Sequence, residues 1–432
     1  MREIREQCIG TSHGVPLYYY PNPHLHSFTL CLYLKAGPLY ETPEQNGISH
    51  FLEHIVFRNA NHILKGNLYK ELDRLGLNLN GVTYREFIQF SISGATVHFE
   101  EAVKLLLLLA EPLVLTSAEI DIERKRIKAE IREASEKNSL DYFTNERIWE
   151  GTSLTQMIAG KPAVLDKIGK KALVEAKEEL MSVGNCFFYL TGSIRPEHLY
   201  FVEKQIERHH FPKTKKLRDN LASLPPVFFQ RDGKIQIKNS DFTLIRLSFD
   251  LRSDCYSDAE LTLLSDVLFH GDYCKIFQEL SEKSGYIYSF SSCLEKYNNI
   301  GSMHLAYEVQ PQNLEKSFIR ALEIFQEMKT HIGDELEYVL APYIDNSVML
   351  LDDPEDLNWT MAYEAHVLGN PYKDLEDRKK AFLAVTPKRL MEIATDIFRP
   401  ENLLITMKGN KKKLEEDGVI GRMEKEVREI LR

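Results

Sequence analysis

The sequence of 432 residues lacks the features that mark several large classes of protein. Its six cysteines form no Cys-x-x-Cys pair, so neither a disulfide framework nor a thiolate metal site is expected. No apolar run approaches the roughly 20 residues that cross a bilayer, and no apolar stretch of the secretory kind follows the first residues. These absences predict a cytoplasmic protein with ordinary thiols and no membrane-spanning segment.

Positively charged residues are also fewer than negatively charged ones. The chain has 54 Lys and Arg residues against 64 Asp and Glu residues, a net charge of −10. A protein that grips phosphate groups normally carries the opposite excess, so neither nucleic acid nor an anionic membrane surface is expected as a partner. Apolar residues are present in the ordinary proportion of 43%, which excludes wholesale disorder and, at this length, predicts two domains.

A linker candidate lies almost at the midpoint of the chain. Residues 213–226 are rich in lysine and proline and have no periodic apolar pattern. We therefore predict an N-terminal domain over residues 1–212 and a C-terminal domain of similar size over residues 227–432.

A weak internal repeat suggests that these halves are duplicates. Residues 52–57 resemble residues 264–269, and residues 68–72 resemble residues 276–280, in the same order. Two unrelated pairs of amphipathic helices would also explain the similarity.

Strand-like and helix-like patterns are interleaved. Residues 27–35, 87–92 and 243–249 alternate as half-buried strands do, whereas residues 102–109 and 116–137 have helical periodicity. This interleaving predicts an α+β fold, with each sheet covered by helices on one face.

The strongest chemical signal is a His-x-x-Glu-His motif at residues 50–54. On a helix, the neighbouring apolar residues form one stripe, and His50, Glu53 and His54 fall on the other side. Two imidazoles four residues apart can point at one zinc ion, and Glu53 can take a proton from a water molecule there. The order of residues is that of the inverted zinc-peptidase motif. The alternative is a polar helix face that contains two histidines by chance.

A catalytic zinc ion needs a third protein ligand. Thr116 and Glu119 have the spacing of a capping box, and the helix that they open places Glu123 and Glu130 two turns apart on one face. Carboxylates in an otherwise apolar stripe are costly unless they are paired or bound to metal, so one of them is a candidate ligand. A solvated edge of the stripe is the alternative.

Residues 36–54, together with a glutamate 76 residues after His54, closely resemble the pitrilysin/insulysin family of zinc metallopeptidases, which includes the mitochondrial processing peptidase. The resemblance implies two tandem homologous α+β domains of the mitochondrial-processing-peptidase-like metallohydrolase fold. Each would be an antiparallel sheet with helices packed on one face, and only the first would carry metal.

The resemblance also implies roles for individual residues. One zinc ion per chain would be bound by His50, His54 and Glu130, with Glu53 as the general base. Glu123 would support the site from behind the ligands.

The segment from Asn80 to Glu86 is similar to the family's Asn-Ala-x-Thr-x-x-Glu segment, near the edge strand that receives the substrate backbone. By this similarity, Asn80, Gly81 and Thr83 are candidate substrate-binding residues.

One departure from the family pattern concerns the second half. Family members carry an arginine seven residues before a tyrosine, and this pair holds the scissile carbonyl. Tyr288 is present as the candidate catalytic tyrosine, but Ser281 stands at the arginine position, and Lys283 nearby has the wrong spacing. A hydroxyl supplies neither the charge nor the fork of donors of a guanidinium.

The sequence thus predicts a zinc-dependent endopeptidase that cleaves short or unfolded peptides inside a closed chamber, as the zinc-bearing subunit of a dimer. The missing arginine favours a heterodimer with a homologous two-domain subunit that carries Arg and Tyr, and a homodimer is the alternative. Two other functions stay open: a non-catalytic scaffold subunit of the same family, and a maturation peptidase dedicated to one ribosomally made peptide.

Overall fold

The computed structural model describes residues 5–12, 14–137, 139–213, 231, 233–297, 299–370 and 372–431. They form two compact units. Unit 1 comprises residues 1–137, 153–223 and 348–377, and unit 2 comprises residues 138–152, 224–347 and 378–432. Each unit therefore takes one segment from the other half of the chain. The linker predicted at residues 213–226 lies, apart from Lys213, outside the described residues, and the domain boundaries stay a prediction.

Unit 1 is built on a six-stranded sheet with the strand order β1-β2-β6-β3-β5-β4. β3 pairs with β5 and β6, and β4 pairs with β5 alone, so β4 forms one edge. The strands are β1 (Gln7–Gly10), β2 (Pro16–Pro21), β3 (Ser27–Lys35), β4 (Asn78–Thr83), β5 (Phe87–Ala95) and β6 (Cys186–Gly192). The strand predicted at residues 27–35 is β3, with the same bounds.

Unit 2 repeats this topology in five strands with the order β7-β11-β8-β10-β9. They are β7 (Ile235–Asn239), β8 (Leu244–Leu251), β9 (Phe290–Tyr297), β10 (Ile300–Glu308) and β11 (Leu403–Gly409). In chain order these correspond to β2 through β6 of unit 1, so the fold class and the duplication of the α+β unit are confirmed.

The sheets are mixed, which corrects the expectation of purely antiparallel pairing. β2 pairs in parallel with β6, and β7 pairs in parallel with β11, while the other pairs are antiparallel. The reason is topological. β6 inserts between β2 and β3, and β11 inserts between β7 and β8. The two strands on either side of the insertion run in opposite directions, so the inserted strand must be parallel to one of them.

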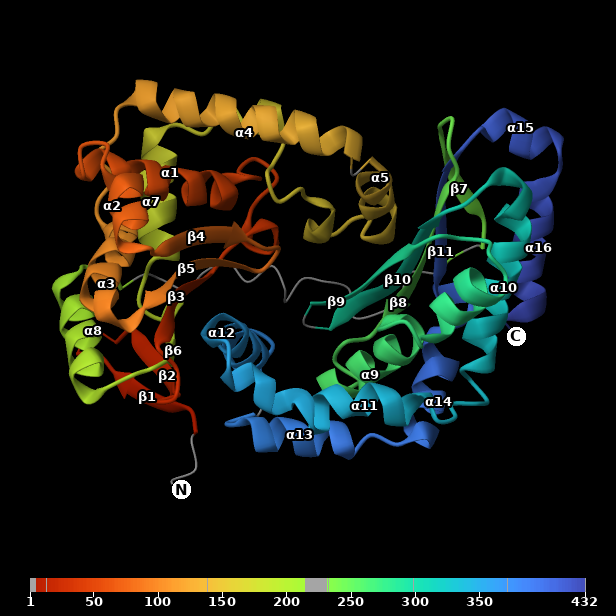
Figure 1. Cartoon of the computed structure of the whole chain (residues 1–432). Coiled ribbons are helices and arrows are strands. Elements are labelled where there is room, and N and C mark those ends of the chain that lie inside the picture. The colour runs from red at the N-terminus through yellow and green to blue at the C-terminus, as the bar shows by residue number, and fades with distance from the viewer. Residues whose placement is uncertain are drawn as a thin grey trace. The chain divides into compact units, whose positions relative to one another are not determined.

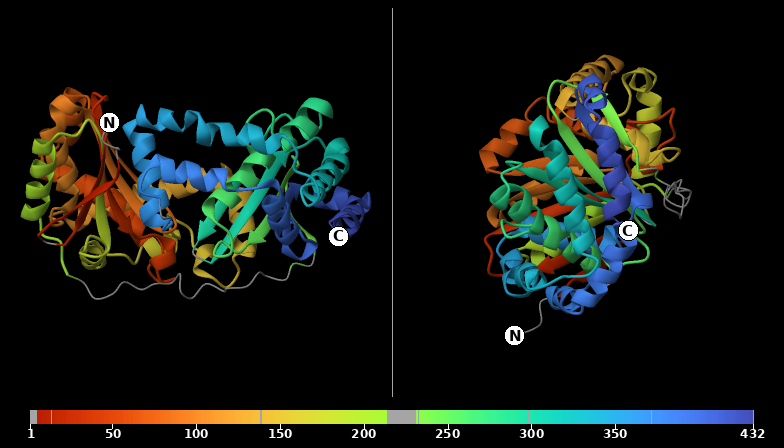
Figure 2. Two further views of the ribbon diagram at one scale, coloured as in Figure 1. Left: turned by 90° about the horizontal axis from the view of Figure 1, so that it is seen from below. Right: turned by 90° about the vertical axis from the view of Figure 1, so that its right-hand side faces the viewer.

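Helices pack on both sheets (Figure 1). Those of unit 1 are α1 (Ile48–Ile63), α2 (Leu68–Leu75), α3 (Phe99–Leu107), α4 (Ser117–Lys137), α6 (Pro162–Leu165), α7 (Lys170–Leu180) and α8 (Pro196–Arg208). Those of unit 2 are α9 (Asp258–Phe269), α10 (Leu314–Glu327), α11 (Glu335–Ile344), α13 (Leu375–Leu383, shared with unit 1), α14 (Pro387–Ile397), α15 (Lys411–Glu416) and α16 (Val419–Ile430). Figure 2 shows α10 beside α16. In the described part of the chain, no helix combines the length and the apolar character needed to cross a bilayer.

Each sheet is also covered on its second face, so the expectation of helices on one face only is incomplete. In unit 1 this face is largely aromatic, and α12 (Pro354–Ala362) packs Leu357 and Met361 against it. Asn358 is fully buried there, accepts a hydrogen bond from Tyr33 Oη at 3.1 Å and donates to the Tyr189 carbonyl at 3.0 Å. In Figure 1, α12 lies across the sheet from α3 and α8. A pattern of sheet alternation cannot reveal this helix, because it comes from the other half of the chain.

The second face of the unit 2 sheet is polar instead. It is covered by α5 (Ser139–Ile148), which belongs to the first half of the sequence. Asp141 of α5 forms an ion pair with the buried Arg246 at 2.7 Å, and Thr144 is hydrogen-bonded to Thr406 at 2.6 Å. The two halves thus exchange one helix each.

Candidate metal centre

The loop before α1 determines where that helix begins. The buried carboxylate of Glu41 accepts hydrogen bonds from the backbone N–H groups of Gly47 at 2.7 Å and Ser49 at 2.9 Å. A negative charge at a helix N-terminus satisfies free N–H groups and complements the helix dipole. Gly47 has φ 94°, and a Cβ there would lie 2.7 Å from Gly160 Cα. The start of α1 is therefore held in place, and with it the positions of the motif residues.

The apolar stripe predicted on α1 is buried, and part of it packs against α4 (Figure 1). The cluster between the helices contains Ile48, Phe51 and Ile55 from α1 and Ile120, Ile127 and Ile131 from α4. Asn59 adds polar anchors, since it donates to the Pro112 carbonyl at 3.1 Å and accepts from the Val114 N–H at 2.9 Å. This packing brings the middle of α4 to the polar side of α1.

His50, His54 and Glu130 come together in this way. One ligand atom from each lies within 4.8 Å of the other two. Nε2 of His50 is 3.6 Å from Glu130 Oε1, and Nε2 of His54 is 3.5 Å from Glu130 Oε2. Ligands at about 2.1 Å around a tetrahedral zinc ion lie about 3.4 Å apart. The donor set of two imidazoles and one carboxylate, and its spacing, therefore fit zinc.

The two imidazoles differ in their protonation. Burial and the neighbouring His54 lower the pKa of His50 to about 4, so its ring is neutral, as a metal ligand must be. Burial alone would lower the pKa of His54 as well, but the carboxylates of Glu123 and Glu130 raise it to about 9. Metal binding at neutral pH therefore requires the release of a proton from His54.

Glu123 and Glu130 take different positions although they share a helix face. Glu123 is buried and accepts hydrogen bonds from His54 Nδ1 at 3.0 Å and Arg58 Nε at 3.1 Å. Burial would raise the pKa of Glu123, but His54 and Arg58 hold it below its usual value. Glu130 faces Nε2 of both histidines, and its side chain is half exposed. Glu123 is thus placed to orient the His54 ring, and Glu130 to bind an ion.

Glu53 lies between the histidines and the edge strand β4. Its carboxylate accepts a hydrogen bond from Thr83 Oγ1 at 2.6 Å, and burial raises its pKa. Gly81 of β4 passes so close to α1 that a Cβ would lie 2.6 Å from the Phe57 ring. Of the predicted substrate-binding residues, Gly81 therefore permits the close approach, Thr83 contacts Glu53, and Asn80 lines the adjacent pocket.

That pocket has a volume of about 260 Å³. All its lining residues belong to unit 1: Glu53, His54, Phe57, Arg58, Asn61, Tyr69, Asn80, Gly81, Glu123 and Arg126. Arg58 and Arg126 were not predicted from the sequence as residues of the site. Their spacing could have indicated a place in the site, since Arg58 follows His54 by one helical turn and Arg126 follows Glu123 by one turn.

The predicted catalytic tyrosine and the serine at the arginine position belong to unit 2. Tyr288 is 94% exposed and is not among the residues that line the pocket. Ser281 sits in a π-helical turn, η6 (Phe277–Lys283). The ammonium of Lys283 is paired with Glu279 at 2.6 Å, and Arg320 binds the same carboxylate at 2.9 Å. Lys283 is thus already engaged and is a poor substitute for the missing arginine.

The helix of unit 2 that corresponds to α1 is α9. Asp266 stands where the repeat places a histidine, and its carboxylate accepts a hydrogen bond from Tyr343 Oη at 2.6 Å. No group of three potential metal ligands is found among the described residues of unit 2.

The sequence matches two family profiles in tandem. Residues 19–161 match the insulinase family, peptidase family M16, and residues 167–339 match the M16 inactive domain. An uncharacterized zinc protease of Rickettsia felis is 23% identical over 405 residues, which cover 89% of this chain and 90% of that protein. Subunit 1 of the rat cytochrome b-c1 complex is 23% identical over 205 residues, or 46% of this chain and 42% of the subunit. The crystal structure of a Helicobacter pylori protease superposes with a TM-score of 0.84, at 16% identity over 94% of this chain and 99% of that one.

Proposed function

We propose that this chain, which belongs to the M16 (insulinase) family of peptidases, is a zinc-dependent endopeptidase that acts on short or unfolded peptides. The observation that carries the proposal is the convergence of His50, His54 and Glu130, with Glu53 beside them. In this proposal His50, His54 and Glu130 hold one zinc ion per chain.

The chain's own residues account for the remaining chemistry. Zinc, when bound, supplies a Lewis acid that polarises the scissile carbonyl and makes water a better nucleophile. The free edge of β4 can bind the substrate backbone by strand addition. Glu53, whose pKa is raised by burial, accepts the proton of the attacking water and delivers it to the leaving nitrogen. Thr83 orients the Glu53 carboxylate, and Glu123 fixes the ring and the tautomer of His54.

The direct test is metal analysis together with a cleavage assay. We expect about one zinc ion per chain after purification without chelators, since the site offers three ligands and leaves one position open. An unfolded protein substrate should be cleaved by the zinc-loaded chain, not after chelation, and again after zinc is restored. A chain that neither retains nor takes up zinc would contradict the proposal.

The partner is proposed to be a related two-domain chain that lacks the zinc motif but carries an arginine and a tyrosine, the two forming an enclosed chamber. Ser281 at the expected arginine position and the engagement of Lys283 with Glu279 support a partner of this kind. Losing one donor to the tetrahedral oxyanion typically costs about 10²–10³ in rate. A homodimer that relies on Tyr288 is the alternative.

Co-purification from the native source, followed by mass spectrometry, would identify the partner. We expect the isolated chain to cleave peptides slowly and to gain about tenfold or more in kcat/KM when the partner is added. Full activity of the isolated chain, unchanged by Tyr288→Phe, would contradict both the partner and the role of Tyr288.

A non-catalytic subunit is the second candidate function. The similarity to subunit 1 of the cytochrome b-c1 complex and the absence of the expected arginine favour it. The two candidate functions are distinguished by a cleavage assay on the zinc-loaded complex with its partner. This complex cleaves peptides only if the protein is an endopeptidase.

A further inference from the structure

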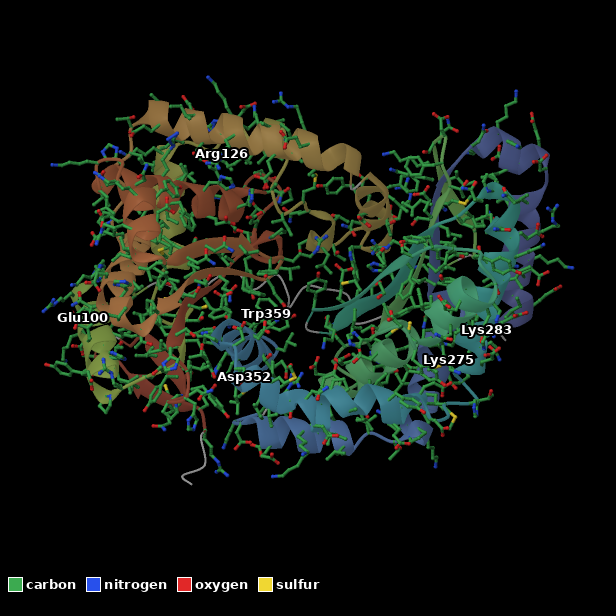
Figure 3. The ribbon with its side chains drawn as sticks, viewed as in Figure 1. Glu100, Arg126, Lys275, Lys283, Asp352 and Trp359 are labelled. Carbon is green, nitrogen blue, oxygen red and sulfur yellow. The ribbon has the colours of Figure 1, made fainter. Side chains whose placement is uncertain are left out.

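Two arginines line the pocket beside the candidate metal centre. Arg58 projects from α1 and Arg126 from α4, where Figure 3 labels it. The same pocket contains Glu53, the proposed base, and Asn80 and Gly81 of the edge strand. A substrate bound along β4, as proposed above, would place a side chain next to its scissile bond in this pocket.

The two guanidinium groups have more donors than the protein uses. Arg58 binds Glu123 through Nε alone, and Arg126 approaches the same carboxylate with one nitrogen at 3.6 Å. Each guanidinium carries five N–H donors, and Glu123 already accepts from His54. The Arg126 side chain is 73% exposed. Most of these donors thus have no acceptor among the described residues.

The charges around the pocket favour an anion once the metal centre is loaded. The carboxylates of the pocket lining and the metal centre are Glu53 on α1 and Glu123 and Glu130 on α4. Tyr69 of α2 and Asn80 of β4, which also line the pocket, add no charge. Glu123 is committed to His54 and Arg58, and Glu130 to the candidate ion. The positive charge of two guanidinium groups and a divalent ion therefore exceeds the negative charge of these three carboxylates.

We propose that this pocket binds a carboxylate of the substrate next to the scissile bond, which for internal cleavage is an Asp or Glu side chain. Arginine pairs with carboxylates in a bidentate manner, which adds geometric selectivity to the charge. The volume of about 260 Å³ is below the range of about 300–1,000 Å³ typical of pockets for small molecules, and it suits one side chain. The inference deepens the proposed function and rests on it.

The selectivity is tested with quenched fluorescent peptides in matched pairs. In one series Glu and Gln are exchanged at each position that flanks the cleaved bond, and in the other the C-terminus is free or amidated. A hydrogen-bonded charge is worth about 1.5–3 kcal/mol, so the carboxylate member of at least one pair should have a kcat/KM about tenfold or more higher. Equal kcat/KM values in both series would overturn the inference. A response in the C-terminal series alone would overturn the side-chain assignment and would indicate a carboxypeptidase.

The assignment to Arg126 is tested with Arg126→Gln in the zinc-loaded protein. The preference should fall to about threefold or less because the carboxylate-specific contact is lost, so kcat/KM should fall more for the carboxylate peptide than for the neutral one. Lys125→Gln is the matched control, since Lys125 is exposed on the same helix and does not line the pocket. Equal losses for both peptides together with loss of zinc would instead make Arg126 a positioning residue for Glu123.

A binding measurement separates this inference from the proposed function. Fluorescence anisotropy on zinc-loaded Glu53→Gln protein should show tighter binding of the carboxylate peptide, and Arg126→Gln in that background should remove the difference. The result does not depend on turnover. Selective binding without any cleavage by the unmodified complex would contradict only the proposal that the protein is a peptidase. Cleavage without selectivity would contradict only the proposal of a carboxylate pocket.

Discussion

Replacing Glu53 with glutamine should lower kcat by about 10²–10⁴ and leave zinc bound. Glu53 faces the space beside the imidazoles but is not one of the three residues whose ligand atoms converge. A glutamine carbonyl can still accept the hydrogen bond from Thr83, so the local structure should persist. What is lost is the proton acceptor for the attacking water, because an amide has no useful basicity near neutral pH.

The measurement pairs single-turnover or steady-state cleavage with zinc content by mass spectrometry. Glu44→Gln is a suitable control, because it makes the same chemical change at an exposed carboxylate ahead of α1. Cleavage by Glu53→Gln at the unmodified rate would show that another group is the base. Loss of zinc in this variant would make Glu53 a ligand and not a base.

Replacing His50 with alanine should remove zinc and activity together. The pKa of the buried His50 ring is lowered to about 4, so this ligand is neutral and ready to bind metal without releasing a proton. Without it, one imidazole and one carboxylate remain, too few for a catalytic zinc site. Metal content after dialysis and peptide cleavage are the two readouts, and His24→Ala controls for the loss of an exposed imidazole.

Because His50 is buried, its replacement can also disturb folding, which circular dichroism would detect. Glu130→Gln is the safer companion variant, since the Glu130 side chain is half exposed. It should also lose most of its zinc. Glu123→Gln should cost less, about 10–100-fold in metal affinity or activity, because Glu123 orients His54 and does not face the ion. If Glu123→Gln lost zinc and Glu130→Gln retained it, the two roles would be reversed.

Local patterns determined much of this site. The apolar stripe of α1 dictates which of its sides is buried, so the side that carries His50, Glu53 and His54 could be read from the residues alone. The capping box at Thr116 is present, with Thr116 Oγ1 and Glu119 bonded to each other's backbone N–H groups. Helix periodicity and capping depend on residues a few positions apart, and such information lies in a short stretch of sequence.

Local spacing did not distinguish Glu123 from Glu130. The family resemblance implied their separate roles, and the tertiary structure gives a physical reason for them. On the sequence both lie on one face of the same helix, and either could be a ligand. The choice follows from how α4 crosses α1, which aims Glu130 at the Nε2 atoms and Glu123 at His54 Nδ1. That crossing depends on the isoleucine cluster between the helices and on Asn59.

The same reason explains the features that the residues alone did not reveal. Arg58 and Arg126 meet in one pocket although they are 68 positions apart, and α12 covers a sheet whose first strand begins more than 300 residues earlier. Local spacing predicted the main helices and strands and the two candidate metal-binding histidines. Packing between segments far apart in the chain placed the two carboxylates differently, brought the two arginines into one pocket and exchanged the helices. No short-range pattern records such packing.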